Sequence, residues 1–297
     1  RTIQDFTTGE MRSEREHNDN DNTNWEIGGD YELDFNHGGK FRFLFVVNNR
    51  ERESTRERFE IATDNSETKN LFIGNSGRDR ERIGRASYIW DLASNQGLEI
   101  GIERAQTIRN SGLLLGTNGT GTASAKVGGL VQQTVSNASS QVEEIRYETF
   151  LVHNWQLNER MSLESSLILE NSTITQTGDV RNERDFDFIR PGVDYRFDIT
   201  PSLQLRATIK KDVSQLSFSD FSATADNSDD DQNTQAGNPD IAQEQSWAYT
   251  VNMEYRLPNN IGVLNSQVYY RDIEDTIDRI DVSTSPTDLR SARGNIG

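Results

Sequence analysis

Hydrophobic and polar residues alternate along much of the chain. One parity of the segment 25–35 holds Trp25, Ile27, Tyr31, Leu33 and Phe35, and acidic residues occupy most of the other. Because successive side chains of a β-strand point to opposite faces, this pattern predicts a strand with one apolar and one polar face. The segment 41–47 repeats the pattern after a Gly-containing link at 36–39, so the two segments predict a β-hairpin.

The same alternation predicts ten strands, over residues 23–35, 40–52, 82–93, 98–108, 141–155, 161–172, 183–198, 203–213, 245–256 and 262–275. Short links at 36–39, 94–97, 156–160, 199–202 and 257–261 alternate with longer ones at 53–81, 109–140, 173–182 and 214–244. Pro191 and Gly192 predict a β-bulge within the seventh strand. Short turns at one end of the strands and long loops at the other are typical of an outer-membrane β-barrel.

The composition fits a barrel better than a soluble domain with a dry core. Only 33% of the residues are hydrophobic, the mean hydropathy is -0.77 and the net charge is -17, yet aromatic residues make up 8% of the chain. Low hydropathy with high charge is typical of disorder, but so many aromatic residues indicate an organised surface. A barrel meets both conditions, because its outer face contacts lipid while its lumen is polar. The acidic balance also argues against a nucleic-acid-binding protein.

The tryptophans support this interpretation. All four lie on the apolar parity, with Trp25 and Trp247 at one end of their strands and Trp90 and Trp155 at the other. These are the positions of the aromatic girdles that flank the lipid-facing band of a barrel. We therefore expect an all-β, antiparallel transmembrane barrel wall with short periplasmic turns and long extracellular loops.

One segment adds a resemblance to a known family. Phe218-Ser219-Asp220-Phe221, an acidic stretch, and then residues 236–246 with Gly237, Asn238, Pro239 and Glu244 resemble a segment late in the barrel of TonB-dependent outer-membrane receptors. The match is specific over residues 184–273, although Ile241 and Gln243 stand where the family pattern has Leu and Pro.

The resemblance implies a barrel of about 22 strands closed by an N-terminal plug. It further implies energised import of a scarce ligand, such as a ferric siderophore, cobalamin, haem or an oligosaccharide, across the outer membrane of a Gram-negative bacterium. The implied partners are outer-membrane lipid and a TonB-type energy-coupling protein, which acts through the plug. No plug sequence is visible in residues 1–297, so we expect the chain to be a partial barrel domain of about ten strands, completed by further strands of a longer receptor.

Candidate ligand contacts lie in the long loops. Phe218 and Phe221 are the aromatic candidates, and Asp229, Asp230 and Asp231 form an acidic cluster that could hold calcium, although such a run is ordinarily a solvated loop. Gly237, Asn238, Pro239 and Glu244 are expected to anchor the loop structurally. Cations on the lumen parity keep an anionic ligand open despite the acidic balance; they are Arg42, Arg85, Arg146, Arg196, Arg206, Lys210 and Arg256.

No catalytic constellation is present, so an enzyme is not expected. Two alternatives stay open: a passive porin-like barrel without a plug, and a secreted β-rich binding or adhesion protein. The first shares every feature except the 237–246 motif, and the second would not need a lipid-facing girdle.

Overall fold

The computed structural model describes residues 2–4, 11–36, 38–135, 137–222, 224–225, 234–236, 238, 240–283, 285 and 291–296. Nearly all regular structure in these residues is β, with three short 3-10 helices: η1 (Ala125–Val127), η2 (Phe218–Phe221) and η3 (Pro258–Asn260). None of the helices in these residues is long and apolar enough to cross a membrane.

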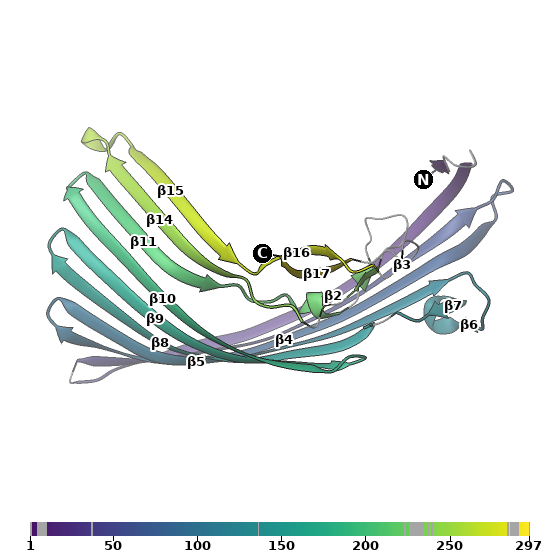
Figure 1. Cartoon of the computed structure of the whole chain (residues 1–297), viewed down its shortest axis with the longest axis horizontal. Coiled ribbons are helices and arrows are strands. Elements are labelled where there is room, and N and C mark those ends of the chain that lie inside the picture. The colour runs from purple at the N-terminus through teal and green to yellow at the C-terminus, as the bar shows by residue number, and fades with distance from the viewer. Residues whose placement is uncertain are drawn as a thin grey trace.

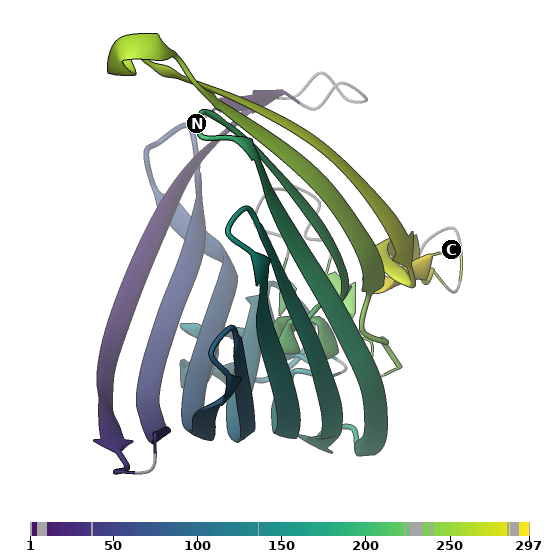
Figure 2. The ribbon, with the colours of Figure 1, turned by 90° about the vertical axis from the view of Figure 1, so that its left-hand side faces the viewer.

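The main sheet is a curved antiparallel wall (Figure 1). Along its main path the strands are β1 (Thr2–Gln4), β2 (Met11–Asp34), β3 (Gly39–Ile61), β4 (Glu67–Ala93), β5 (Gln96–Thr117), β8 (Ser139–Asn158), β9 (Met161–Gly178), β10 (Asn182–Thr200), β11 (Leu203–Val213), β14 (Gln245–Arg256) and β15 (Val263–Glu274). The short strands β6 (Ala123–Ser124) and β7 (Leu130–Gln133) attach beside β5. Figure 2 shows the long strands of the wall side by side.

The ten predicted strands are confirmed in their order, because β2 to β5, β8 to β11, β14 and β15 each overlap one of them. The predicted ranges of β11 and β14 equal the observed ones and that of β15 is one residue too long at each end, whereas the first seven predicted strands are too short. The strands β2 to β5 have 22–27 residues each, whereas about 9–11 tilted residues suffice to cross a bilayer. Outside the lipid both faces of a strand can be polar, so the alternation of hydropathy ends while the backbone pairing continues. In β2 to β5, β8 (Ser139–Asn158) and β9 (Met161–Gly178) the prediction found the segment with an apolar face and missed the polar extension.

The predicted long loops at 53–81 and 173–182 are therefore wrong. The first is a hairpin in which β3 and β4 pair from Ile61 and Glu67 onward, across a tight turn at 62–66. Asn65 has a positive φ of 64° in that turn, a conformation that asparagine tolerates better than most residues. In place of the second predicted loop, only residues 179–181 connect β9 and β10. Of the four predicted long loops, two contain long connections: 214–244 and 109–140, although the first residues of 109–140 belong to β5.

The predicted β-bulge at Pro191 and Gly192 is also wrong. The pairing of β10 with β9 runs without a shift from Phe188 opposite Glu170 to Val193 opposite Ser165. The apparent change of parity arises because Phe186 and Phe188 face the concave side, where Phe186 packs against a hydrophobic cluster. These two aromatic side chains pack on the concave face and do not contribute to the lipid surface.

The two faces of the wall differ as the alternation predicts. Large apolar side chains on the outer face are exposed, among them Ile27 at 61% and Val268 at 70%. The opposite, concave face buries charged residues such as Glu144 and Glu170. Trp25 lies in the middle of β2 and not at its start. It marks the end of the apolar band and not the end of the strand.

A second sheet, which the sequence did not predict, lies on the concave side of the wall (Figure 1). Its order is β12 (Thr224–Ala225), β13 (Thr234–Ala236), β17 (Ser291–Ile296) and β16 (Thr276–Asp281), and β13 pairs with β17 in parallel. It ties the connection between β11 and β14 to the segment after β15. Among the described strands, β2 and β15 do not pair with each other, so the wall is open at both edges.

Candidate functional site

Most of the charge on the concave face is compensated by ion pairs. A ladder crosses the middle of the wall from β4 to β10, in which each arginine lies beside carboxylates: Arg85–Glu103 (3.6 Å), Arg146–Glu103 (3.7 Å), Arg146–Glu148 (3.2 Å), Arg190–Glu148 (3.2 Å) and Arg190–Glu170. The other cations predicted for the lumen are also paired, as Arg42–Glu32, Arg196–Asp198, Arg206–Asp194, Lys210–Asp212 and Arg256–Glu254. These residues therefore leave little free positive charge for a ligand.

A polar pocket lies on the concave face near the end of the wall that carries the long connections. Its lining residues come from β3, β4, β5 and the residue after η2, and are Arg50, Arg52, Ser54, Asn75, Ser76, Gly77, Asp79, Arg109, Ser111, Gly112 and Ser222. We call this the arginine pocket. Its volume is about 340 Å³, which lies within the range of small-molecule sites.

Two of the three arginines in this pocket have no acidic partner in the described residues. The cross-strand neighbours of Arg52 are Asn22 and Gly77, and one neighbour of Arg50 is Asn24. The other neighbour of Arg50 is Asp79, whose two carboxylate oxygens accept bonds from Arg109 Nη1 at 3.0 and 3.2 Å. Within the described part of the chain, neither Arg50 nor Arg52 makes a side-chain hydrogen bond or ion pair. Both side chains are exposed to the pocket.

One side of the pocket is formed by the β11–β14 connection, which folds back onto the wall. Phe218 and Phe221 are 7% and 2% exposed and lie edge to face with ring centroids 6.3 Å apart. They form a hydrophobic cluster with Val142, Ile174, Leu216 and Ile241, and Phe186 and Ile277 pack against it. The two aromatic candidates thus anchor the connection, and a direct contact between either ring and a ligand stays a prediction.

Buried polar contacts hold the same connection. The backbone carbonyl of Phe221 accepts hydrogen bonds from Gln176 Nε2 at 2.9 Å and from Asn137 Nδ2 at 3.1 Å. Arg184 Nη1 donates to the carbonyl of Ile241 at 2.7 Å. Because a buried carbonyl without a partner costs free energy, these bonds fix the position of η2 and of Ser222 at the pocket.

The family-like motif also has a structural role where it is described. The backbone N–H of Asn238 donates to the carbonyl of Asp220 at 2.8 Å, and Asn238 Nδ2 donates to the carbonyl of Arg293 at 2.9 Å. Asn238 thereby joins η2 to β17. For Glu244 the backbone carbonyl accepts a bond from Ser214 N at 2.8 Å, and among the described residues its carboxylate makes no hydrogen bond.

Several predicted site residues lie outside the described residues: Asp229, Asp230 and Asp231 of the acidic cluster, and Gly237 and Pro239 of the motif. A calcium ion in the acidic cluster stays a prediction. In the part of the chain that is described, no group of three or more His, Asp or Glu side chains is placed to hold a metal ion.

Asp220 is the acidic residue of η2. Burial raises the pKa of its carboxyl above the ordinary value, and the nearby cations Arg293 and Arg109 oppose this shift only in part. Arg109 therefore interacts with two carboxylates, since it is hydrogen-bonded to Asp79 and attracted by Asp220. Its charge is more fully compensated than that of Arg50 or Arg52.

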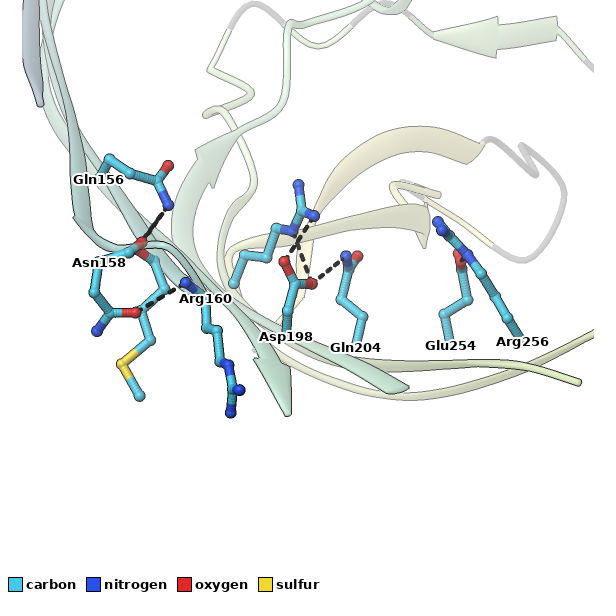
Figure 3. A network of polar contacts seen from close by, with 9 residues as sticks. Gln156, Asn158, Arg160, Asp198, Gln204, Glu254 and Arg256 are labelled. Atoms are coloured by element: carbon cyan, nitrogen blue, oxygen red, sulfur yellow. Dashed lines mark hydrogen bonds and ion pairs between the residues drawn. The ribbon is translucent and has the colours of Figure 1, made fainter. Parts of the chain in front are cut away.

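The short-turn end of the wall carries a separate polar network (Figure 3). Asp198 accepts bonds from Arg196 Nη2 at 2.9 Å and Gln204 Nε2 at 2.7 Å, and Glu254 accepts from Arg256 Nε at 2.9 Å. At the β8–β9 turn, Asn158 Oδ1 accepts from the backbone N–H of Arg160 at 2.9 Å. These bonds stabilise the turns and compensate the charges at this end.

Sequence reasoning missed Arg50, Arg52 and Arg109 because the first two lay at the end of a predicted strand and the third in a predicted loop. A signal was present, however. Even-numbered positions of β3 hold Arg50, Arg52, Arg56 and Arg58, which is the period-two spacing of one strand face. This spacing predicts that the strand continues beyond residue 52, provided that both faces of a strand can be polar outside the lipid.

Comparison with known proteins agrees with this architecture. A family model described as the β-barrel of TonB-dependent receptor-like proteins matches residues 2–297. A search of curated protein sequences gives no significant match.

Solved structures show the same fold at low sequence identity. The ferric-catecholate import receptor Fiu from E. coli superposes with a TM-score of 0.63 at 10% identity, over 94% of this chain and 43% of that receptor. The ferric enterobactin receptor PfeA from Pseudomonas aeruginosa gives a TM-score of 0.53 at 13% identity, over 93% and 47%. The RagAB peptide transporter gives 0.58 at 15% identity, over 95% and 33%.

The chain thus spans less than half the length of these structures. The family model matches almost every residue of the chain. The structure has an open wall, an exposed apolar outer face and a β11–β14 connection that folds inward. The chain belongs to the TonB-dependent receptor-like β-barrel family.

Proposed function

We propose that this chain forms part of the barrel wall of a receptor that imports a scarce ligand across the outer membrane of a Gram-negative bacterium. The outer face would contact lipid, and the concave face would line the route of the ligand. In this orientation the tight turns at 94–95 and 201–202 face the periplasm, and the arginine pocket faces the outside.

One observation carries this proposal: the two faces of a single wall have opposite character, and the longest connection folds inward. Exposed apolar side chains cover the outer face of β2, β14 and β15. The concave face holds the charged ladder, the arginine pocket and the buried η2. A secreted adhesion protein would not need an apolar surface of this extent, because soluble proteins rarely expose large contiguous apolar patches.

The family supports energised import over passive diffusion. A plug domain outside these residues would close the barrel, and a TonB-type protein would couple it to an energy source. The ligand would be a small molecule or an oligosaccharide, from the classes of siderophores, cobalamin, haem or oligosaccharides. The related structures include a ferric-catecholate import receptor and a peptide transporter.

The test compares uptake in cells with and without the complete receptor gene, over a panel of labelled ligands from these classes. We expect receptor-dependent uptake of at least one ligand, and its loss when a protonophore collapses the proton gradient. Receptor-dependent uptake that persists after the gradient collapses would instead support the passive porin-like alternative. Recovery of the receptor from cells without detergent would contradict membrane insertion.

A further inference from the structure

We infer that the arginine pocket recognises a soluble polyanion, a ligand that carries at least two oxyanion groups such as carboxylates or phosphates. This inference rests on the proposed function, because it names the ligand class that the concave face would select. It starts from the contrast between the compensated cations of the wall and the two uncompensated arginines of the pocket.

The charge pattern of this pocket differs from that of the cations predicted for the lumen. The seven cations predicted for the lumen each have a carboxylate partner, with separations of 2.6–3.7 Å. Beside Arg50 and Arg52 the neighbouring strands place Asn22, Asn24, Gly77 and Asp79. Of these only Asp79 is acidic, and its carboxylate is bound by Arg109. In a chain with a net charge of -17, two adjacent arginines that have no carboxylate partners in the described residues create a local positive potential that attracts anions.

The spacing of the two arginines allows each to bind its own anionic group. Arg50 and Arg52 are two residues apart on the same face of β3, so their backbone positions are about 6.6 Å apart. A guanidinium binds a carboxylate or phosphate through paired N–H donors. A ligand with two oxyanions a few atoms apart can therefore engage both arginines at once.

The other lining groups complete the recognition of a polar ligand. Asn75 and the hydroxyl residues Ser54, Ser111 and Ser222 offer neutral donors around the two arginines. Asp79 does not repel an anion strongly, because its charge is paired with Arg109. The pocket opens to the concave face, away from the apolar outer surface, so its ligand is a soluble molecule and not a lipid headgroup.

The experiment measures binding to the complete receptor in detergent by titration calorimetry, with no energy source present. Citrate and pyrophosphate are the probes, and maltose is the neutral comparison. The variants are R50Q/R52Q, the charge-preserving R50K/R52K and the control R256Q, which removes an exposed but paired arginine of the same face. Because Arg50 and Arg52 have no partner in the described residues, the Gln variant unpairs no carboxylate there and is expected to fold.

We expect saturable binding of at least one polyanion and none of maltose. In R50Q/R52Q the affinity should fall at least ten-fold, since removing one charge-assisted hydrogen bond to a ligand weakens binding by about ten-fold or more. R50K/R52K should recover part of that affinity, and R256Q should bind like the original protein. Absence of saturable polyanion binding, or an unchanged affinity in R50Q/R52Q, would overturn the inference.

The inference about the arginine pocket and the proposed function can fail independently of each other. If the receptor binds a polyanion in detergent but supports no energised uptake, the proposed function fails and the inference holds. If energised uptake is found but the receptor shows no saturable polyanion binding, the proposed function holds and the inference fails.

Discussion

At the scale of single residues, the burial of side chains in η2 depends on contacts with distant segments of the chain. Phe218 and Phe221, the aromatic candidates for ligand contact, are buried in the cluster that holds η2 against the wall, and a contact between either ring and a ligand stays a prediction. Their burial depends on Val142 and Ile174, which belong to the distant strands β8 and β9. No local pattern around η2 contains that information.

Asp220 gives a prediction at this scale. Burial raises the pKa of its carboxyl, so protonation is more favourable in the folded state than in the unfolded chain. The contribution of this group to the stability of η2 is therefore most favourable below the ordinary pKa and is lost as the pH rises through the raised value. We expect Asp220→Asn, which keeps the shape without the charge, to increase hydrogen-exchange protection of residues 218–222 at pH 7 relative to the original protein, and to change it little near pH 4.

Asp64 provides a control for the Asp220 prediction, because the pKa of its carboxyl is shifted in the opposite direction. Hydrogen bonds from Ser66 lower the pKa of this exposed carboxyl in the β3–β4 turn. Its contribution is therefore present at neutral pH and is lost as the pH falls through the lowered value. Asp64→Asn should reduce protection of the turn 62–66 at pH 7, after correction for intrinsic exchange rates. Equal responses of the two variants at pH 7 would contradict this assignment of the two carboxyls.

At the scale of strands, the alternation of apolar and polar residues located ten strands but underestimated how far they extend. In β14 the apolar face continues along the whole strand, and the predicted range 245–256 equals the observed one. In β3 the pattern fades after Val47 and the strand continues to Ile61. The difference is physical, because a lipid surface requires an apolar face and water does not, while hydrogen bonds to neighbouring strands are available in both.

The two faces of β14 can be tested directly. Val251 is exposed on the outer face between Ala207 and Val268, whereas Thr250 lies on the concave face opposite Thr208 and Tyr269. If Val251 lies near the middle of the bilayer, Val251→Arg should lower the unfolding free energy of the complete receptor in lipid vesicles by about 2–4 kcal/mol. Thr250→Arg should cost much less. Thr250 is a better control than Asn252, because Asn252 lies opposite Arg206 and an arginine there would face a like charge.

At the scale of the whole molecule, the curved wall was predictable and the small second sheet was not. The sheet depends on a parallel pairing between β13 and β17, whose positions are separated by more than 50 residues. Its bonds are supplemented by single side chains such as Asn295, which donates to the carbonyls of Ala242 and Asp275 at 3.0 and 2.7 Å. Short strands of this kind have too few residues to show an alternation.

The open edges of the wall lead to the last prediction. Among the described residues, β15 pairs only with β14, and β2 pairs with β3 and, at residues 11–13, with β1. Each backbone donor or acceptor left without a partner in hydrocarbon costs several kcal/mol, so an open wall is not stable in a bilayer. We expect the wall to be completed by further strands, and residues 1–297 expressed alone should give no heat-modifiable, protease-resistant species in detergent.

The measurement compares electrophoretic mobility before and after boiling, together with trypsin resistance, for residues 1–297 and for the complete receptor. Only the complete receptor should migrate differently when unheated, because a closed barrel resists unfolding by cold detergent whereas an open sheet exposes two edges to it. If residues 1–297 alone show the mobility shift and the resistance, the edges of β2 and β15 must be able to pair, within one chain or between two. A small closed pore would then be possible without other strands, and the balance between energised import and passive diffusion would move toward diffusion.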